Sequence, residues 1–353
     1  MKFFDSFIYL LTALYLMFLT YFIFYSSDTY SSSSKAVQSI FSNDLQCKQK
    51  QNNPCLSPPI TDSQIKAGIA AVASAKSISD YSLPTALLAA NLVKYVYSLI
   101  QMNENSQVVN TKFPTDFSTN LTKLLTVSNK TDKSTTNFGC IFQDKNSNLW
   151  IAFRGTSRKI DEWFQDFDYY QQAKDTKPEP KHTQVALPVP NTSGLFDINS
   201  NNKILIHEGF EKIYQQFKTQ LEKIVSDHIK KNPNTKIIIT GHSLGAAIAS
   251  VTATHLAILN YPSVVYNFAC PRFCNPQTCP IISNKTIIFN HTNTTDVVPF
   301  LPPAVSPNFT NPSDPFIYSH CGKYIFFSKN LDSLTNNHSL GSYINQLLSS
   351  KFK

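Results

Sequence analysis

The sequence predicts an α/β fold in which a mostly parallel central sheet is covered by helices on both faces. Short apolar runs rich in β-branched residues, which suit buried strands, alternate with segments of helical spacing. The 353 residues are 42% hydrophobic and 12% aromatic, which is enough for a large core. Residues 236–240 are mostly isoleucine, and the chain passes from them through Gly241 and Gly245 into alanine-rich sequence. This pattern indicates a strand, a tight turn and a helix in succession.

The N-terminal part of the chain is expected to lie outside this fold. Residues 7–25 are almost wholly apolar and long enough to cross a hydrocarbon core as a helix, so residues 1–25 are predicted to be a transmembrane anchor or a signal peptide. An uncleaved anchor is favoured because no good small-residue cleavage site follows. Both interpretations send the rest of the chain into the secretory pathway, with the domain on the lumenal or extracellular side, or secreted after cleavage. Residues 26–60, rich in Ser, Asn, Gln and Pro, are expected to form a stalk.

Residues 61–353 are predicted to form a single domain. Alanine-rich helices are expected up to about residue 100, and residues 208–231 also have helical spacing. Residues 169–202 are polar and contain several prolines, so a long excursion rather than a regular element is expected there. Apolar runs predict further strands at residues 138–142, 149–154, 264–268 and 286–290.

Ser243 is a candidate nucleophile because it lies on the predicted strand-to-helix turn. On such a turn the hydroxyl is lifted above the sheet edge, and the amide of the next residue points at the group that the hydroxyl attacks. A serine also needs a base within hydrogen-bond reach and a group that orients the base. Asp296 follows the strand predicted at 286–290, at the edge where parallel strands end. His338 lies in a polar loop and is preferred as the base over His320, which begins an apolar strand-like run.

Six motifs occur in the chain in the order AFRGTS, HEGF, GHSLGAA, DVVPFLPP, YSHCGKYIFF and HSLGSYI. Together they make the chain resemble the class 3 lipases, the fungal-type triacylglycerol lipase family with the α/β-hydrolase fold. The resemblance covers roughly residues 80–348. It implies that Ser243 is the nucleophile, Asp296 the orienting acid and His338 the base. It also implies an oxyanion hole formed by the backbone N–H groups of Leu244 and Thr156.

A lid is expected near residues 157–168. Apolar side chains recur there at helical spacing, with charged residues on the other faces. A core helix would show the same pattern, but the position directly after the expected oxyanion loop matches the lid of the family, which covers an apolar cleft in water and exposes it against lipid. The predicted lid residues are Ile160, Trp163, Phe164 and Phe167.

The predicted function is hydrolysis of carboxylic esters of lipids, such as triacylglycerols or other acylglycerols, at a lipid–water interface. The alternatives are a phospholipase A1 or another esterase with the same triad and, more remotely, an inactive anchored lipid-binding protein. No metal or other cofactor is expected, because no metal cluster, nucleotide loop or haem motif is evident in the sequence. The net charge of +8 is scattered without a basic block, so no nucleic-acid partner is expected, and no obligate protein partner is evident.

Cysteines and glycosylation acceptors agree with export of the domain. The chain has seven cysteines, and the close spacings of Cys47 with Cys55 and of Cys274 with Cys279 suggest two disulfides, although the sequence alone does not give the connectivity. Cys140, in an apolar run, is the candidate for a buried free thiol. Asn-X-Ser/Thr acceptors occur at Asn120, Asn129, Asn191, Asn284, Asn290, Asn293, Asn308 and Asn337.

Overall fold

A computed structural model of the chain describes residues 57–75, 80–105, 116–128, 135–156, 184–187, 204–306 and 313–349. All of them belong to the compact unit Pro54–Lys353. The predicted anchor or signal at residues 1–25, most of the stalk at 26–60 and the expected lid at 157–168 lie outside the described residues. None of the described helices combines the length and the apolar character that a membrane span requires.

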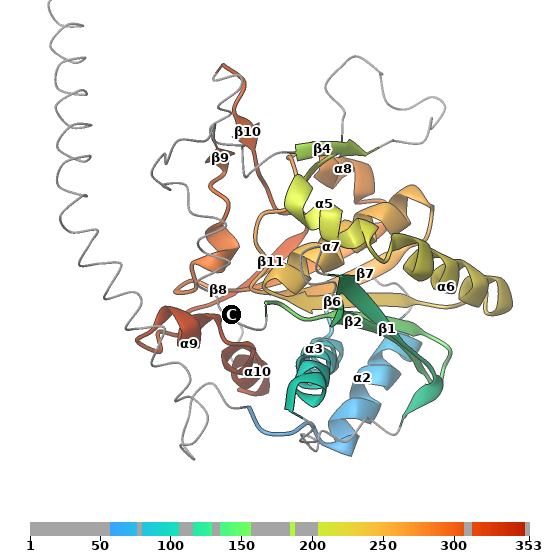
Figure 1. The fold of residues 1–353 in the computed structure, drawn as a ribbon. Coiled ribbons are helices and arrows are strands. Elements are labelled where there is room, and N and C mark those ends of the chain that lie inside the picture. The colour runs from blue at the N-terminus through green and yellow to red at the C-terminus, as the bar shows by residue number, and fades with distance from the viewer. Residues whose placement is uncertain are drawn as a thin grey trace, which may run out of the picture. The chain divides into compact units, whose positions relative to one another are not determined.

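A seven-stranded sheet forms the centre of the described unit (Figure 1). The first three strands of this sheet pair antiparallel, and the remaining strands pair parallel from the third strand onward. The prediction of a mostly parallel sheet is therefore confirmed. The strands lie in the spatial order β1 (Phe117–Ser128), β2 (Thr135–Asp144), β3 (Leu149–Phe153), β6 (Ile237–His242), β7 (Ser263–Phe268), β8 (Thr286–Asn293) and β11 (Lys323–Phe327).

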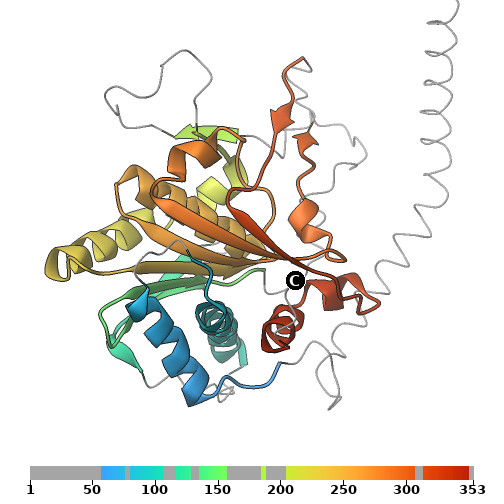
Figure 2. The same cartoon turned by 180° about the vertical axis from the view of Figure 1, so that it is seen from behind.

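Helices pack on both faces of the sheet (Figures 1 and 2). Each face has its own apolar core, so the sheet is buried on both sides. One face is covered by α2 (Asp62–Ser74), α3 (Leu83–Asn105) and α10 (Leu340–Leu348). The other is covered by α5 (Glu208–Gln215), α6 (Lys218–Lys231), α7 (Leu244–Ile258) and α8 (Thr278–Ile282).

The isoleucine run of β6 shows why these residues form a central strand. Ile237 and Ile239 belong to the core under α5, α6 and α7, whereas Ile238 belongs to the core under α2 and α3. Successive side chains of a strand point to opposite faces, so a strand that is buried on both faces is apolar at every position. The continuous β-branched run is thus accounted for by its place in the middle of the sheet.

Most predicted elements are confirmed, and one prediction is wrong. The strands expected at 138–142, 149–154, 264–268 and 286–290 lie within or overlap β2, β3, β7 and β8. The residues with helical spacing at 208–231 divide into α5 and α6. The expectation that residues 169–202 contain no regular element is wrong at β4 (Gln184–Leu187), which pairs antiparallel with β5 (Ile204–His207). The backbone hydrogen bonds of β4 are made by a strand outside this stretch, so the local sequence does not reveal them.

The cysteine pairing differs from the prediction. The structure has a disulfide between Cys279 and Cys321, so the predicted pair of Cys274 with Cys279 is wrong. Cys274 is a buried free thiol whose Sγ lies 3.5 Å from Cys321 Sγ. Three sulfur atoms therefore meet in space, and sequence spacing does not tell which two are joined. Cys140 is free and buried, as predicted, and burial raises the pKa of its thiol to about 12.

Several glycosylation acceptors are buried by the fold. The side chains of Asn290, Asn293 and Asn337 are 2%, 0% and 5% exposed and are hydrogen-bonded inside the unit. An acceptor must reach the surface to carry a glycan, so these three are excluded in the folded chain. Asn284 is exposed.

Candidate active site

Ser243 lies on a strained turn between β6 and α7. Its backbone angles are φ 59° and ψ −131°, a positive φ that residues with a side chain rarely adopt. The Ser243 N–H donates a 3.0 Å hydrogen bond to the carbonyl oxygen of Phe268 at the end of β7. Such strain persists only where the surrounding structure fixes it, and it is concentrated at functional sites.

Two glycines allow the close packing of this turn. A Cβ atom on Gly241 would overlap the backbone oxygen of Gly245, and a Cβ atom on Gly245 would overlap the backbone oxygen of Arg154 at the end of β3. Any side chain at either position would push the turn away from the sheet. The spacing of the two glycines around Ser243 therefore follows from backbone contacts.

Asp296 and His338 form a buried pair. His338 Nδ1 lies 2.9 Å from Asp296 Oδ2, and the two side chains are 4% and 0% exposed, respectively. The other carboxylate oxygen accepts a 3.0 Å hydrogen bond from the backbone N–H of Val298. A carboxylate accepts, so Nδ1 of His338 carries the hydrogen and Nε2 presents its lone pair. Nε2 is buried and has no hydrogen-bond partner among the described residues.

The loop after β3 packs against the serine turn. A Cβ atom on Gly155 would lie 2.8 Å from Ser243 Cβ, so only glycine fits between them. Thr156 follows Gly155, and its hydroxyl oxygen is buried with no hydrogen-bond partner among the described residues. Leu244 is the first residue of α7. Amides in the first turn of a helix have no acceptor within the helix, so the Leu244 N–H is available to another group.

Residues 150–306 match the family model described as "Lipase (class 3)". The match spans less than half of the chain, and over these residues the chain is similar to the class 3 lipases. The mostly parallel sheet and the strained serine turn between β6 and α7 are features of the α/β-hydrolase fold.

Curated proteins that are similar to this chain include fungal lipases. The secreted mono- and diacylglycerol lipase A of Penicillium cyclopium is 36% identical over 95 residues, which are 27% of this chain and 31% of that protein. The secreted mono- and diacylglycerol lipase 1 of Fusarium solani is 33% identical over 101 residues, 28% of this chain and 30% of that protein. The chain thus spans about a third of the length of these relatives. A solved structure of the Penicillium cyclopium protein has a TM-score of 0.44 and 23% identity, covering 72% of this chain and 84% of that one.

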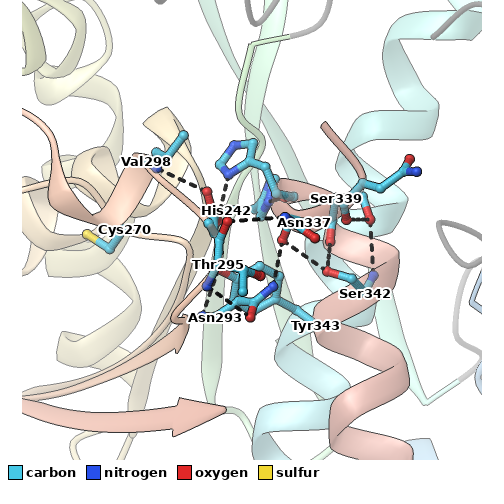
Figure 3. A network of polar contacts seen from close by, with 12 residues as sticks. His242, Cys270, Asn293, Thr295, Val298, Asn337, Ser339, Ser342 and Tyr343 are labelled. Carbon is cyan, nitrogen blue, oxygen red and sulfur yellow. Dashed lines mark hydrogen bonds and ion pairs between the residues drawn. The ribbon is translucent and has the colours of Figure 1, made fainter. Parts of the chain in front are cut away.

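A network of asparagine contacts joins the segments that carry Asp296 and His338 (Figure 3). Asn293, at the end of β8, donates through Nδ2 to the backbone oxygen of Asn337 at 3.2 Å. Asn337 donates through its own Nδ2 to the backbone oxygen of Thr295 at 3.2 Å. Asp296 follows Thr295, and His338 follows Asn337 at the end of α9 (Leu334–His338). These bonds hold the turn that carries the acid against the helix that carries the histidine.

Tyr343 of α10 also contacts the acid. Its hydroxyl donates to Asp296 Oδ2 at 2.7 Å and accepts a 3.2 Å hydrogen bond from the backbone N–H of Asn293. Burial and the neighbouring Asp296 raise the pKa of the Tyr343 phenol well above its ordinary value, so the hydroxyl stays protonated and keeps its hydrogen for the carboxylate. Asp296 Oδ2 is therefore shared by two groups, Tyr343 and His338.

His242, directly before the serine, was not assigned a role from the sequence. Its Nδ1 lies 2.9 Å from the Tyr97 hydroxyl, and its Nε2 lies 2.7 Å from the backbone oxygen of His338. Tyr97, on α3, has no sequence signal that separates it from the core aromatics of that helix. The motif GHSLG marks His242, but only the fold shows what the ring contacts.

The remaining sequence candidates lie as follows. His320 is hydrogen-bonded to the Cys270 carbonyl at 2.7 Å and to the Tyr324 hydroxyl at 2.9 Å, so its ring is engaged away from Asp296. Burial lowers the pKa of His320 to about 4. The structure brings His338, and not His320, to the acid. The lid candidates Ile160, Trp163, Phe164 and Phe167 lie outside the described residues.

The described part of the chain has one group of three side chains that could hold a metal ion. It consists of Cys274, Cys279 and Cys321, two of which form the disulfide. The group is separate from the residues around Ser243.

Proposed function

We propose that this chain is a class 3 lipase, a serine hydrolase that cleaves carboxylic esters of lipids. The observation that carries the proposal is the buried pair of Asp296 and His338, which leaves His338 Nε2 without a hydrogen-bond partner in the part of the chain that the structure describes. A histidine that is oriented by a carboxylate through one ring nitrogen has the other nitrogen available as a general base. Ser243, on its strained turn, is the proposed nucleophile.

The proposed reaction is a two-step acyl transfer. His338 Nε2 takes the proton of the Ser243 hydroxyl as Oγ attacks the ester carbonyl carbon, and the carbonyl oxygen becomes an oxyanion. The tetrahedral intermediate collapses, the bond to the leaving alcohol breaks, and His338 returns the proton to that alcohol. A water molecule, deprotonated by His338, then attacks the acyl-enzyme, and the fatty acid leaves as Ser243 regains its hydrogen.

The oxyanion is proposed to be bound by the backbone N–H groups of Leu244 and Thr156. Gly155 packs against the serine turn, which holds the two loops that carry these amides close together. Donors that are fixed before the reaction stabilise charge without reorganisation. One such donor lowers the activation barrier by about 3 kcal/mol. Asp296 is proposed to hold the tautomer of His338 and to stabilise the imidazolium form.

Acylglycerols are the proposed substrate class. The relatives from Penicillium cyclopium and Fusarium solani are named as mono- and diacylglycerol lipases. A phospholipase A1 or another esterase would use the same residues, so the substrate panel below includes phospholipids. We also propose that residues 157–168 form a lid that opens at a lipid surface.

The domain at residues 61–353 is proposed to be exported, because the two relatives are named as secreted proteins. Residues 1–25 are proposed to direct this export, as an anchor or as a cleaved signal, and residues 26–60 to act as a stalk.

The test combines active-site labelling with a substrate panel. The purified chain is expected to react with a fluorophosphonate and to release fatty acid from tri-, di- or monoacylglycerols or from phospholipids. Ser243→Ala is expected to lose both activities, and Ser283→Ala, which changes an exposed serine, is expected to keep them. Labelling that persists in Ser243→Ala, or no release of fatty acid by the wild-type chain from any of these lipids, would overturn the proposal.

A further inference from the structure

A chain of three hydrogen bonds connects the loops that carry the proposed site. The backbone N–H of Gly155 donates to the Tyr97 hydroxyl at 2.8 Å. The Tyr97 hydroxyl lies 2.9 Å from His242 Nδ1, and His242 Nε2 lies 2.7 Å from the backbone oxygen of His338. Gly155 precedes the proposed oxyanion residue Thr156, and His242 precedes the nucleophile. The chain therefore reaches the oxyanion loop, the serine turn and the base in succession.

When the His242 ring is neutral, the two ends of this chain fix the direction of every hydrogen bond in it. The Gly155 N–H only donates and the His338 carbonyl only accepts. The Tyr97 oxygen accepts from Gly155 and gives its own hydrogen to His242 Nδ1. His242 Nδ1 is then an acceptor, so its hydrogen is on Nε2, where it is donated to His338. The pattern is complete only when His242 is neutral and in the Nε2–H tautomer.

The surroundings of His242 also favour the neutral ring. Its side chain is 4% exposed, and burial, followed by the nearby His338, lowers the pKa of His242 well below its ordinary value. The aromatic and titratable rings that face it are His338 at 4.7 Å, Tyr97 at 5.9 Å and Tyr343 at 6.1 Å between ring centroids. A charged His242 would reverse the bond from Tyr97. It would also repel the imidazolium that forms on His338 in the proposed reaction.

We infer that Tyr97 and His242 are positioning residues. They act through the backbone groups of Gly155 and His338. Their hydrogen bonds keep the oxyanion loop and the base at fixed positions relative to Ser243. This inference rests on the proposed function. Neither side chain transfers a proton to the substrate. Instead, Tyr97 and His242 link three separate segments through one chain of hydrogen bonds. A shift of the base is therefore resisted by the loop that carries the oxyanion donor. A misplacement of about 1 Å in an active site can cost ~10²-fold in rate.

Two substitutions of His242 each keep one end of the chain of hydrogen bonds and remove the other. The amide nitrogen of Gln reaches the position of imidazole Nε2, so His242→Gln keeps the donor to the His338 carbonyl. The side-chain oxygen of Asn reaches the position of Nδ1, so His242→Asn keeps the acceptor for Tyr97 but loses the bond to His338. Tyr97→Phe removes the hydroxyl while it keeps the ring.

The first experiment measures kcat and KM of these variants on a soluble short-chain p-nitrophenyl ester, together with their thermal midpoints. His242→Asn and Tyr97→Phe are expected to lower kcat by ~10- to 100-fold with KM nearly unchanged, because the loss is one of positioning. His242→Gln is expected to retain at least ~5-fold more kcat than His242→Asn. Equal kcat values for the Gln and Asn variants at equal thermal midpoints, or wild-type kcat in Tyr97→Phe, would overturn the inference.

A second experiment uses the wild-type chain and needs no variant to fold. Nuclear magnetic resonance of the histidine rings is expected to show His242 neutral and in the Nε2–H tautomer at pH values at which an ordinary histidine is already charged. Titration of His242 near its ordinary pKa, or the Nδ1–H tautomer, would contradict the inference even if the enzyme is active. If the wild-type chain neither reacts with a fluorophosphonate nor hydrolyses esters, the proposed function fails. The tautomer of His242 then still shows whether the chain of hydrogen bonds has the inferred direction.

Discussion

Tyr343 donates its hydroxyl hydrogen to Asp296 Oδ2 across 2.7 Å. The same oxygen faces His338 Nδ1, so the phenol and the imidazole share the negative charge of one atom. Tyr343→Phe removes one of the two donors and leaves more of that charge to the imidazole. Asp296 Oδ2 is then in contact with the imidazole of His338 alone among these two groups.

Tyr343→Phe is therefore expected to lower kcat by ~3- to 10-fold, because the carboxylate that orients His338 loses one of its donors. The measurement is hydrolysis of a soluble ester, together with the thermal midpoint. Tyr324→Phe, on the exposed side of β11, should leave kcat unchanged. Wild-type kcat in Tyr343→Phe would show that the hydroxyl contributes nothing to the position of the acid.

Asp296→Asn is expected to lower kcat by ~10⁴-fold, because an amide nitrogen beside Nδ1 would favour the wrong tautomer of His338. The turn should persist, since an Asn side-chain oxygen can still accept from the Val298 N–H, as Oδ1 does at 3.0 Å. The variant and the wild type are compared by their kcat on a soluble ester, their rate of fluorophosphonate labelling and their thermal midpoint. Retention of activity within tenfold of the wild type would remove Asp296 from the proposed triad.

His291 is expected to make the stability of the fold depend on pH. Its ring is 1% exposed and lies between the Asn267 carbonyl and the Tyr81 hydroxyl. Burial lowers its pKa from 6.5 to about 4, although the contact with the Asn267 carbonyl acts in the opposite direction. Between these values the unfolded chain binds the proton and the folded chain does not. The free energy of unfolding therefore falls as the pH drops from 6.5 towards 4, by about 3 kcal/mol from this group.

Urea unfolding at pH 7.5 and pH 4.5 measures this dependence. His291→Asn keeps a donor for the Asn267 carbonyl and removes the titrating ring, so the difference between the two pH values should shrink by a large part of that contribution. His320 and His242 remain in both proteins and cancel in the comparison. An unchanged difference would show that His291 is charged in the fold or is not the group responsible.

The proposed lid gives a prediction that depends on the physical state of the substrate. Replacing Trp163 and Phe164 with Ser removes apolar surface from a segment that is proposed to face lipid. Hydrolysis of an emulsified ester should fall far more than hydrolysis of a soluble short-chain ester. Equal losses on the two substrates would indicate that the segment supports the fold rather than the interface.

The central strand and the serine turn were predictable because their signals are local. The isoleucines of β6 and the small residues of α7 favour different backbone conformations on either side of Ser243. Burial on both faces then follows from the continuous apolar run. The strand pairing of β4 with β5 was not predictable in the same way, because the partner lies outside the segment.

The polar groups around the proposed triad were only partly predictable. Asp296 and His338 are separated by 42 residues, and the order of the motifs suggested them as a pair before the structure placed them 2.9 Å apart. Tyr97 and Tyr343 lie on helices whose other apolar residues fill the core, so each has the sequence pattern of a packing residue. Only the fold brings their hydroxyls to His242 and to the acid. The disulfide of Cys279 with Cys321 was missed for the same reason, since proximity along the chain is a poor guide to proximity in space.

The described groups around Ser243 are far apart in the sequence, from Tyr97 to Tyr343. Under the proposed assignments, a polypeptide still being synthesised has its nucleophile in place well before its base and the tyrosine that contacts the acid. Such an incomplete chain can bury much of its sheet and still be catalytically silent. With the proposed export and the proposed triad, the chain therefore has no ester-hydrolase activity towards the membrane that it crosses until translation has passed α10.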